Sequence, residues 1–193
     1  MEIGVNQLAK SDYWRAAMYT RLREQLAENP VSGEGVEIGG SNGVIQSMLP
    51  GVRWEVRNYP RYDVTTESTY DRDWDVIVTD QVLEHVTKPW EAIRLMGQHC
   101  KKLTVITVPF LIRIHNSPGD FWRMTPQAIH SMAEPYFSDI QINSWGTVKG
   151  NHWHALYNST ETLMQNVPET ELESELDNNQ AQHPFVIWAV LRK

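Results

Sequence analysis

The sequence predicts an α/β fold with a mostly parallel sheet, and three observations lead to this prediction. Residues 35–43 form a short apolar run that ends in a glycine-rich turn, as a strand followed by a helix would. Residues 74–79 and 103–108 are compact apolar runs, which is typical of parallel strands buried on both faces. Strand-like and helix-like segments alternate as far as residue 110.

An amphipathic helix is predicted before the first strand. Ser11 and Asp12 suit its start, and Pro30 ends the pattern. Apolar residues recur at every fourth position between them, namely Trp14, Met18, Leu22 and Leu26. We expect residues 1–30 to form an N-terminal helical cover, which packs over one sheet face or lies across the mouth of a ligand site.

The stretch after the glycine turn predicts a helix over 44–49 and a strand over 52–57. Pro60 argues against a long strand at 59–64. Only short irregular sequence leads from there to the strand at 74–79, too little for a full crossover helix. A third strand or helix of the standard unit is therefore expected to be missing or reduced.

The second half of the chain predicts two helices and two strands besides the strand at 103–108. Pro89 and Pro126 stand at first-turn positions of the helices, where a missing N–H costs nothing, and Thr125 is the expected cap of the second helix. The strands are expected over 138–145 and 185–191. Because residues 146–184 are polar with an acidic run, we expect a polar acidic loop or an insertion there.

Composition limits the classes of function. With 193 residues, the chain has the length of a single domain, residues 1–193. A formal charge of −7 argues against binding nucleic acid by its backbone, so no nucleic-acid partner is expected. Cys100 is the single cysteine, which excludes an intrachain disulfide and favours a reducing, cytoplasmic setting. No signal peptide or membrane span is visible in the sequence.

Three sequence blocks resemble one known family. Residues 37–43 read Glu-Ile-Gly-Gly-Ser-Asn-Gly, residues 74–86 end in Leu-Glu-His-Val, and residues 120–126 read Asp-Phe-Trp-Arg-Met-Thr-Pro after His115. In this order and spacing they resemble class I S-adenosylmethionine-dependent methyltransferases, over residues 33 to 145. The resemblance implies a Rossmann-like methyltransferase sandwich with an antiparallel C-terminal strand. It also implies S-adenosyl-L-methionine as cofactor and a small-molecule substrate.

The same resemblance implies which residues bind the cofactor. The methionine end is held by Glu37 and the turn backbone, through Gly39, Gly40, Ser41 and Gly43. The residues expected near the reacting sulfonium follow the strand at 74–79 and are Asp80, Gln81, Val82 and His85. They stand where a parallel strand delivers its carboxyl end to the crevice that binds ligands in open α/β sheets.

The nucleoside contacts depart from the usual pattern. An acid normally accepts hydrogen bonds from the ribose at the end of the second strand, but this chain has Asn58 there. An amide can accept one such bond and donate another. Asp63 and Val64 correspond to the segment that contacts adenine, although Asp63 suits a local backbone cap almost as well.

Catalysis is expected to involve the loop after the central strand. His115 is the favoured base if the acceptor is a hydroxyl or a protonated amine, and His85 is a second candidate that could instead bond backbone carbonyls. Asp120 and Arg123 either contact the substrate or pair with each other to hold the loop. The subgroup with the Asp-x-Trp-Arg-x-Thr-Pro block suggests a small polar acceptor, with a sugar or glycan hydroxyl favoured.

No metal site is expected. The run from Gln81 to His85 begins with a neutral amide, so a hard cation would lack one charged oxygen. His152 and His154 have no further acids or cysteines at ligand spacing nearby.

Two other functions stay open. Residues 39–43 also fit Gly-x-Ser-x-Gly, the nucleophile elbow of hydrolases, with Ser41 attacking. That motif normally follows several strands rather than the first, and Glu37 would then have no role. The other alternative is a catalytically inactive module that binds S-adenosylmethionine and methylates nothing.

Overall fold

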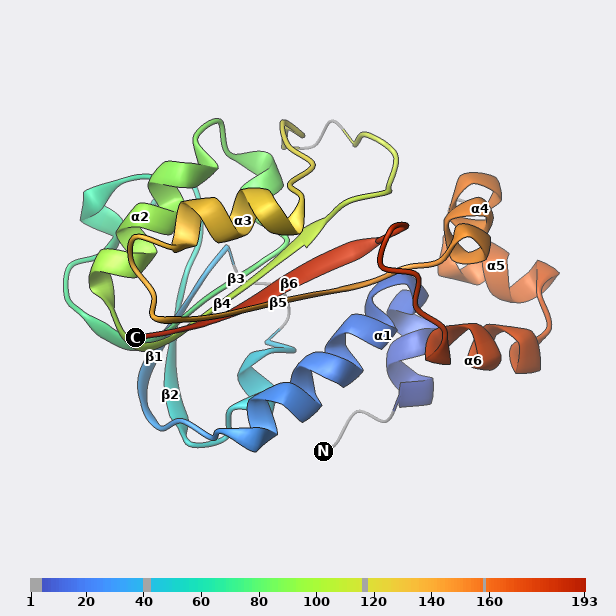
Figure 1. Cartoon of the computed structure of the whole chain (residues 1–193), viewed down its shortest axis with the longest axis horizontal. Coiled ribbons are helices and arrows are strands. Elements are labelled where there is room, and N and C mark those ends of the chain that lie inside the picture. The colour runs from blue at the N-terminus through green and yellow to red at the C-terminus, as the bar shows by residue number, and fades with distance from the viewer. Residues whose placement is uncertain (1–4, 40–42, 116–117, 158) are drawn as a thin grey trace.

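The computed structural model describes residues 5–39, 43–115, 118–157 and 159–193, with the backbone alone for residues 5–12. Its described strands form one sheet in the order β2-β1-β3-β4-β6-β5 (Figure 1). They are β1 (Gly33–Ile38), β2 (Val52–Arg57), β3 (Trp74–Asp80), β4 (Cys100–Pro109), β5 (Asp139–Trp145) and β6 (Val186–Arg192). Strand β6 is antiparallel to β4 and β5, whereas β2, β1, β3 and β4 pair in parallel. The predicted α/β class, with an antiparallel C-terminal strand, is confirmed.

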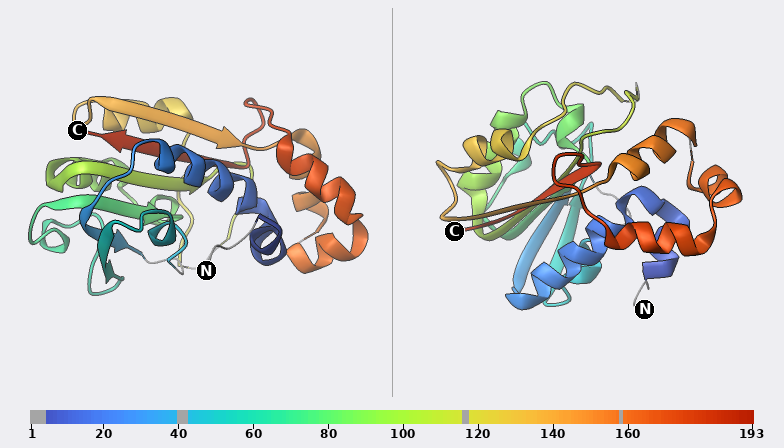
Figure 2. Two further views of the ribbon diagram at one scale, coloured as in Figure 1. Left: turned by 90° about the horizontal axis from the view of Figure 1, so that it is seen from below. Right: turned by 45° about the vertical axis from the view of Figure 1, so that its right-hand side comes forward.

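Helices cover both faces of this sheet. Helices α2 (Pro89–His99) and α3 (Pro126–Ala133) lie on one face, and α1 (Val5–Glu28) crosses the other (Figure 1). Helices α4 (Val148–Leu156), α5 (Thr160–Asn166) and α6 (Glu169–Asp177) gather beside one end of the sheet, close to the start of α1 (Figure 2). None of the helices in the described ranges combines the length and the apolar character needed to cross a membrane.

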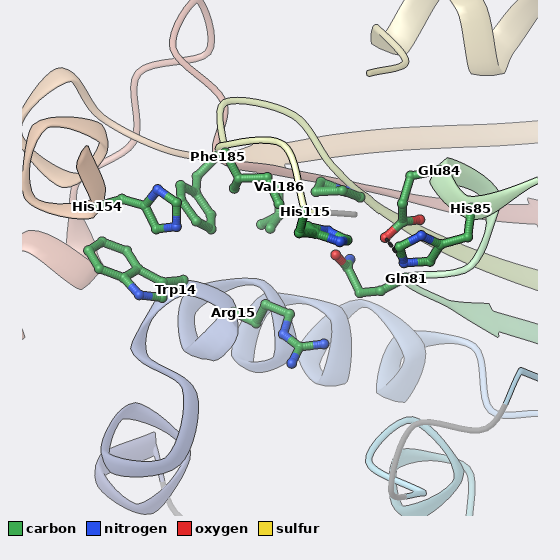
Figure 3. Close-up of a pocket in the computed structure, with 11 residues that line it drawn as sticks. Trp14, Arg15, Gln81, Glu84, His85, His115, His154, Phe185 and Val186 are labelled. Atoms are coloured by element: carbon green, nitrogen blue, oxygen red, sulfur yellow. Dashed lines mark ion pairs between the residues drawn. The ribbon is translucent and has the colours of Figure 1, made fainter. Parts of the chain in front are cut away.

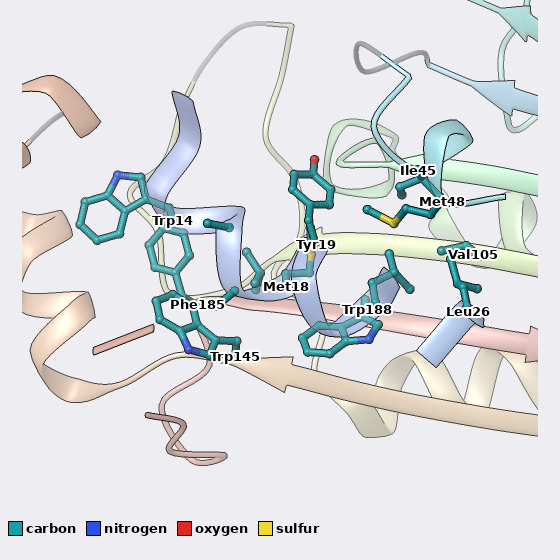
Figure 4. Packing of buried hydrophobic residues seen from close by; sticks show 14 of the residues in the cluster. Trp14, Met18, Tyr19, Leu26, Ile45, Met48, Val105, Trp145, Phe185 and Trp188 are labelled. Atoms are coloured by element: carbon teal, nitrogen blue, oxygen red, sulfur yellow. The ribbon is translucent and has the colours of Figure 1, made fainter. Parts of the chain in front are cut away.

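The core between α1 and the sheet is rich in aromatic side chains. Met18 and Leu26 of α1 are buried, together with Trp145 of β5 and Trp188 of β6 (Figure 4). Fully burying one such large apolar side chain stabilises the fold by about 1.5–3 kcal/mol. The regular spacing of apolar residues along α1 therefore places this helix firmly over one sheet face.

Two predicted helix boundaries are wrong. Helix α1 begins at Val5 rather than at Ser11, because residues 7–10 have good helix propensity and extend the helix upstream. The helix predicted over 44–49 is reduced to the 3-10 turn η1 (Gln46–Met48). Pro50 directly follows the predicted helix and disfavours helical geometry at Leu49, so there is room for one turn only.

The two connections that looked irregular in the sequence have different structures. Between β2 and β3 the structure has only the 3-10 turn η2 (Glu67–Thr69), so the crossover element is reduced, as predicted. Residues 146–184 were expected to form a polar loop or an insertion. The prediction of a loop is wrong, because this segment contains α4, α5 and α6. Thr147 and Ser159 cap the first two of these helices. Trp153 of α4 and buried leucines of α5 and α6 belong to the core. That residues 1–193 form a single domain stays a prediction.

Candidate functional site

The glycine turn after β1 forms the first part of the site. Glu37 is fully buried near the end of β1, and its carboxylate accepts a hydrogen bond from the Gln46 side chain. Gly39 (φ 90°) and Gly43 (φ 69°) adopt left-handed backbone conformations that favour glycine. The Gly39 N–H donates to the Arg57 carbonyl at 2.9 Å, which ties the turn to β2. The turn is thus held by backbone geometry and by a buried acid.

The turn after β3 packs directly on the glycine turn. The Val82 side chain occupies the space that a Cβ atom on Gly39 would fill. A larger residue at position 39 would therefore push the two turns apart. Gly40 and Ser41, two of the predicted cofactor contacts, lie outside the described residues.

Asp80 ends β3 as a buried carboxylate with protein partners. One oxygen accepts from the Tyr19 hydroxyl of α1 at 2.7 Å, and the other accepts from Thr107 of β4. Gln81 follows with φ 56°, an unfavourable left-handed conformation for a residue with a side chain. Its N–H donates to the Thr107 carbonyl at 3.1 Å. The end of β3 is therefore held in a fixed, strained shape, which is common at ligand sites.

The predicted nucleoside contacts follow β2. Asn58 is exposed directly after the last residue of this strand. Asp63 accepts from the Thr65 N–H at 2.8 Å and from the Thr65 hydroxyl at 2.7 Å, so one of its oxygens caps a local turn. Val64 is buried in the core below that turn.

The groups at this edge suit S-adenosylmethionine. Glu37, Asn58 and Asp80 stand at or just after the carboxyl ends of three adjacent parallel strands. Carboxylates attract ammonium and sulfonium groups and accept from hydroxyls, whereas they repel a pyrophosphate. Glycines in the turn let a ligand lie close to the main chain. The donor set therefore fits a cofactor that has a positive charge and a ribose.

A cavity of about 310 Å³ lies beside the end of β3 (Figure 3). Helix α1, the β3 turn, the loop after β4, helix α4 and the start of β6 all contribute to its wall. The lining residues are Trp14, Arg15, Gln81, Glu84, His85, Pro109, Ile112, His115, His154, Phe185 and Val186. Gln81 belongs both to the cofactor edge and to this cavity, so the two features adjoin.

Glu84, His85 and His115 form a cluster on the cavity wall. The Glu84 side chain is 2% exposed, and Oε1 lies 3.6 Å from Nε2 of His85. Burial raises the pKa of Glu84 to about 8, and its Oε2 has no hydrogen-bond partner among the described residues. His85 Nδ1 bonds the Gly119 carbonyl, and the His85 and His115 ring centroids are 5.0 Å apart. The expectation that His85 bonds a backbone carbonyl is thus met, while its other nitrogen faces Glu84.

Asp120 and Arg123 pair with each other behind the loop that carries His115. Both guanidinium nitrogens Nη1 and Nη2 donate to the Asp120 carboxylate, the second at 2.6 Å. Asp120 also accepts from the backbone N–H of His115 at 3.0 Å. Arg123 lowers the pKa of Asp120 to about 2. Neither residue is among those that line the cavity, and Asp120 contacts His115 through the backbone N–H of His115.

An aromatic wall closes the other side of the cavity. The Trp14 ring stacks on Phe185 with centroids 5.3 Å apart, and the His154 ring meets both edge-on. Burial, aided by the charge of Arg113, lowers the pKa of His154. This wall joins the N-terminal helix, α4 and β6, which are distant in sequence.

Several residues of the site were missed in the sequence. They are Trp14, Arg15, Tyr19, Glu84, His154 and Phe185. Glu84 had a usable signal, because it follows a predicted strand next to a histidine. For the others, the sequence analysis named no role at the site, although it allowed the N-terminal helix to lie across the mouth of a ligand site. Phe121 and Trp122, in the loop before α3, are exposed.

Comparison with solved structures identifies the fold. A SAM-dependent methyltransferase from Archaeoglobus fulgidus matches with a TM-score of 0.58 and 14% identity, over 93% of this chain and 94% of that one. The N-methyltransferase NodS from Bradyrhizobium japonicum WM9, in complex with S-adenosyl-L-homocysteine, matches with a TM-score of 0.57 and 15% identity, over 97% and 90%.

A third similar structure covers only part of its own chain. Phosphoethanolamine N-methyltransferase 2 from Haemonchus contortus, in complex with S-adenosyl-L-methionine, matches with a TM-score of 0.52 and 10% identity, over 97% of this chain and 57% of that one. No family model and no curated protein matches this chain. The chain therefore has the fold of S-adenosylmethionine-dependent methyltransferases.

Proposed function

We propose that this chain is an S-adenosylmethionine-dependent methyltransferase that acts on a small polar acceptor, with a sugar or glycan hydroxyl favoured. The observation that carries the proposal is the junction at Gln81. Gln81 is part of the acidic, glycine-rich edge that suits the cofactor, and it also lines the cavity that contains His85 and His115. A donor site and an acceptor site thus meet at one strained residue, in a fold that similar structures use for methyl transfer.

The cofactor edge would position the methyl donor. When bound, S-adenosylmethionine supplies a methyl group on a positively charged sulfur. Glu37 and Asp80 provide negative charge at the ends of β1 and β3, and the backbone around Gly39 lets the ligand lie close. Asn58 would hold the ribose, with Asp63 and Val64 shaping the adenine side. Holding a methyl donor and an acceptor in one orientation would supply much of the rate.

The cavity would hold the acceptor. Trp14 and Phe185 give one wall an apolar surface for the C–H face of a sugar ring, while the opposite wall is polar. S-adenosylmethionine would supply the methyl group, and a ring nitrogen of His115 would accept the proton that the acceptor hydroxyl loses. Asp120 is unsuited as this base because its pKa is low, so we assign Asp120 and Arg123 to positioning His115.

The serine hydrolase alternative has no observation in its favour among the described residues, and Ser41 lies outside them. Covalent labelling of Ser41 by a fluorophosphonate would overturn the methyltransferase proposal. The cytoplasmic setting and the absence of a nucleic-acid partner stay predictions.

Calorimetry with S-adenosylmethionine and S-adenosylhomocysteine tests the cofactor half directly. Binding of both is expected, and no binding of either at about millimolar concentration, which corresponds to roughly 4 kcal/mol, would remove the proposal.

Transfer of a tritiated methyl group to a panel of monosaccharides and nucleotide sugars tests the acceptor half. Binding of the cofactor without transfer to any acceptor class would favour the inactive binding module. If His115→Ala kept full turnover at every pH on an identified hydroxyl acceptor, the assignment of the base would be wrong.

A further inference from the structure

We propose that Glu84, His85 and His115 form a binding site for a divalent transition-metal cation such as Zn²⁺ on the cavity wall. One ligand atom from each residue lies within 4.8 Å of the other two. The sequence led us to expect no metal, because Gln81 is neutral in the run that ends at His85. The structure changes this, because the loop after β4 brings His115 beside that run as a third ligand.

The hydrogen bond of His85 to the backbone leaves its second ring nitrogen facing Glu84. The Gly119 carbonyl can only accept, so Nδ1 of His85 carries the proton of the neutral ring and Nε2 presents a lone pair. That lone pair faces Glu84 Oε1 at 3.6 Å, and once the carboxyl has released its proton both atoms can donate an electron pair to a cation between them. A backbone carbonyl bonded to the outer nitrogen is the usual way to orient a metal-binding histidine.

Glu84 supplies the second, independent observation. Its side chain is 2% exposed, and Oε2 has no partner in the described part of the chain. A buried carboxyl oxygen without a hydrogen-bond partner destabilises the folded protein. The nearby guanidinium of Arg123 is paired with Asp120. A cation held by Glu84 and both histidines would give this buried carboxylate a positively charged partner.

The donor set selects the kind of cation. Two imidazoles and one carboxylate suit Zn²⁺, Co²⁺, Ni²⁺ or Fe²⁺, whereas Mg²⁺ and Ca²⁺ require mainly oxygen ligands. In a tetrahedral zinc site the ligand atoms lie roughly 3.3 Å apart, given metal–ligand distances near 2.0–2.1 Å. The 3.6 Å separation of Glu84 Oε1 and His85 Nε2 is close to this value. Three protein ligands leave a position open toward the cavity.

The function of such a site rests on the proposed methyltransferase activity, but its existence does not. A cation held by the three residues would bind the acceptor oxygen at its open coordination position. It would lower the pKa of the acceptor hydroxyl, and the released proton would pass to water in the cavity. His115 would then hold the cation instead of acting as the base. The two roles of His115 differ in one observable way, because only the cation site requires added metal.

Titration of Zn²⁺ into the chelator-treated full chain, followed by calorimetry, tests the site without any methyl acceptor. We expect stoichiometric binding, no binding of Mg²⁺, and a loss of zinc affinity of about 100-fold or more in Glu84→Gln and in His115→Ala. His152→Ala is the matched control, because His152 is exposed on α4, and it should bind like the parent protein. Circular dichroism of each variant establishes that it is folded.

The outcomes are distinct. Absence of zinc binding, or equal affinity in the parent protein and both folded cluster variants, would overturn the metal site. If zinc binds at the cluster but chelator-treated protein methylates its acceptor at the full rate, the catalytic role is overturned. In both cases binding of S-adenosylhomocysteine still reports separately on the proposed function.

Discussion

The cofactor edge and the cavity beside it adjoin at Gln81, yet they are held in place by different means. The edge is held by parallel strands, by backbone hydrogen bonds such as Gly39 N–H to Arg57, and by the packing of Val82 on Gly39. The cavity instead depends on side chains from distant segments. Changes at the edge should therefore alter folding and cofactor binding together, whereas changes around the cavity should act locally.

Gly39→Ala should break the edge most severely. The new Cβ would meet the Val82 side chain, and φ 90° is strained for any residue other than glycine. We expect a loss of about 2–4 kcal/mol in the free energy of unfolding, measured by denaturant titration. Gly39→Ala combined with Val82→Ala should recover part of this loss by removing the clash. Gly43→Ala is the control with strain but no close neighbour, and a loss equal to that of Gly39→Ala would contradict the packing argument.

Glu37→Gln should weaken cofactor binding while the cavity stays intact. The variant keeps the shape of a fully buried side chain and removes its charge. Because a charged hydrogen bond contributes about 1.5–3 kcal/mol, we expect the affinity for S-adenosylhomocysteine to fall about 10–100-fold in calorimetry. Glu34→Gln, on the exposed side of the same strand, should bind normally. Unchanged affinity in folded Glu37→Gln would show that this acid does not bind the cofactor.

Asp120→Asn should loosen the cavity loop and leave the edge unchanged. It removes the charge that pairs with Arg123 and weakens the acceptor for the His115 N–H. We expect exchange of the His115 amide hydrogen to accelerate about 10-fold, as the loss of a charged hydrogen bond implies. The Gly39 amide, bonded to Arg57, serves as the internal reference and should exchange at its original rate. Equal acceleration of both amides would mean that the two regions are not independent.

The smallest effect is expected at the aromatic wall, as a function of pH. The pKa of His154 is lowered in the folded protein, so the unfolded chain takes up its proton more readily. Its contribution to stability is therefore complete above the ordinary pKa of 6.5 and is lost as the pH falls through the lower folded value. His154→Gln should show a smaller decrease in melting temperature between neutral and acidic pH than the parent protein. Parallel pH profiles would contradict this.

Local sequence patterns were sufficient for most of the fold. The apolar runs at β3 and β4, the Thr125-Pro126 start of α3 and the glycines after β1 were each interpreted correctly, because their causes lie within a few neighbouring residues. The helices α4, α5 and α6 were missed because they are stabilised by a few buried side chains that join the core, namely Trp153, Leu163, Leu172 and Leu176, and not by local propensity.

The sequence by itself determined the α/β class and the acid followed by a glycine turn, and its resemblance to known methyltransferases implied the antiparallel last strand. Only the tertiary structure decided that Tyr19 bonds Asp80, that Trp14 stacks on Phe185, and that His115 joins Glu84 and His85. Strand and turn signals repeat over two to four residues, so they can be recognised within a short window. Contacts between segments far apart in the chain depend on which faces pack together, and this is settled only when the sheet and its helices have assembled.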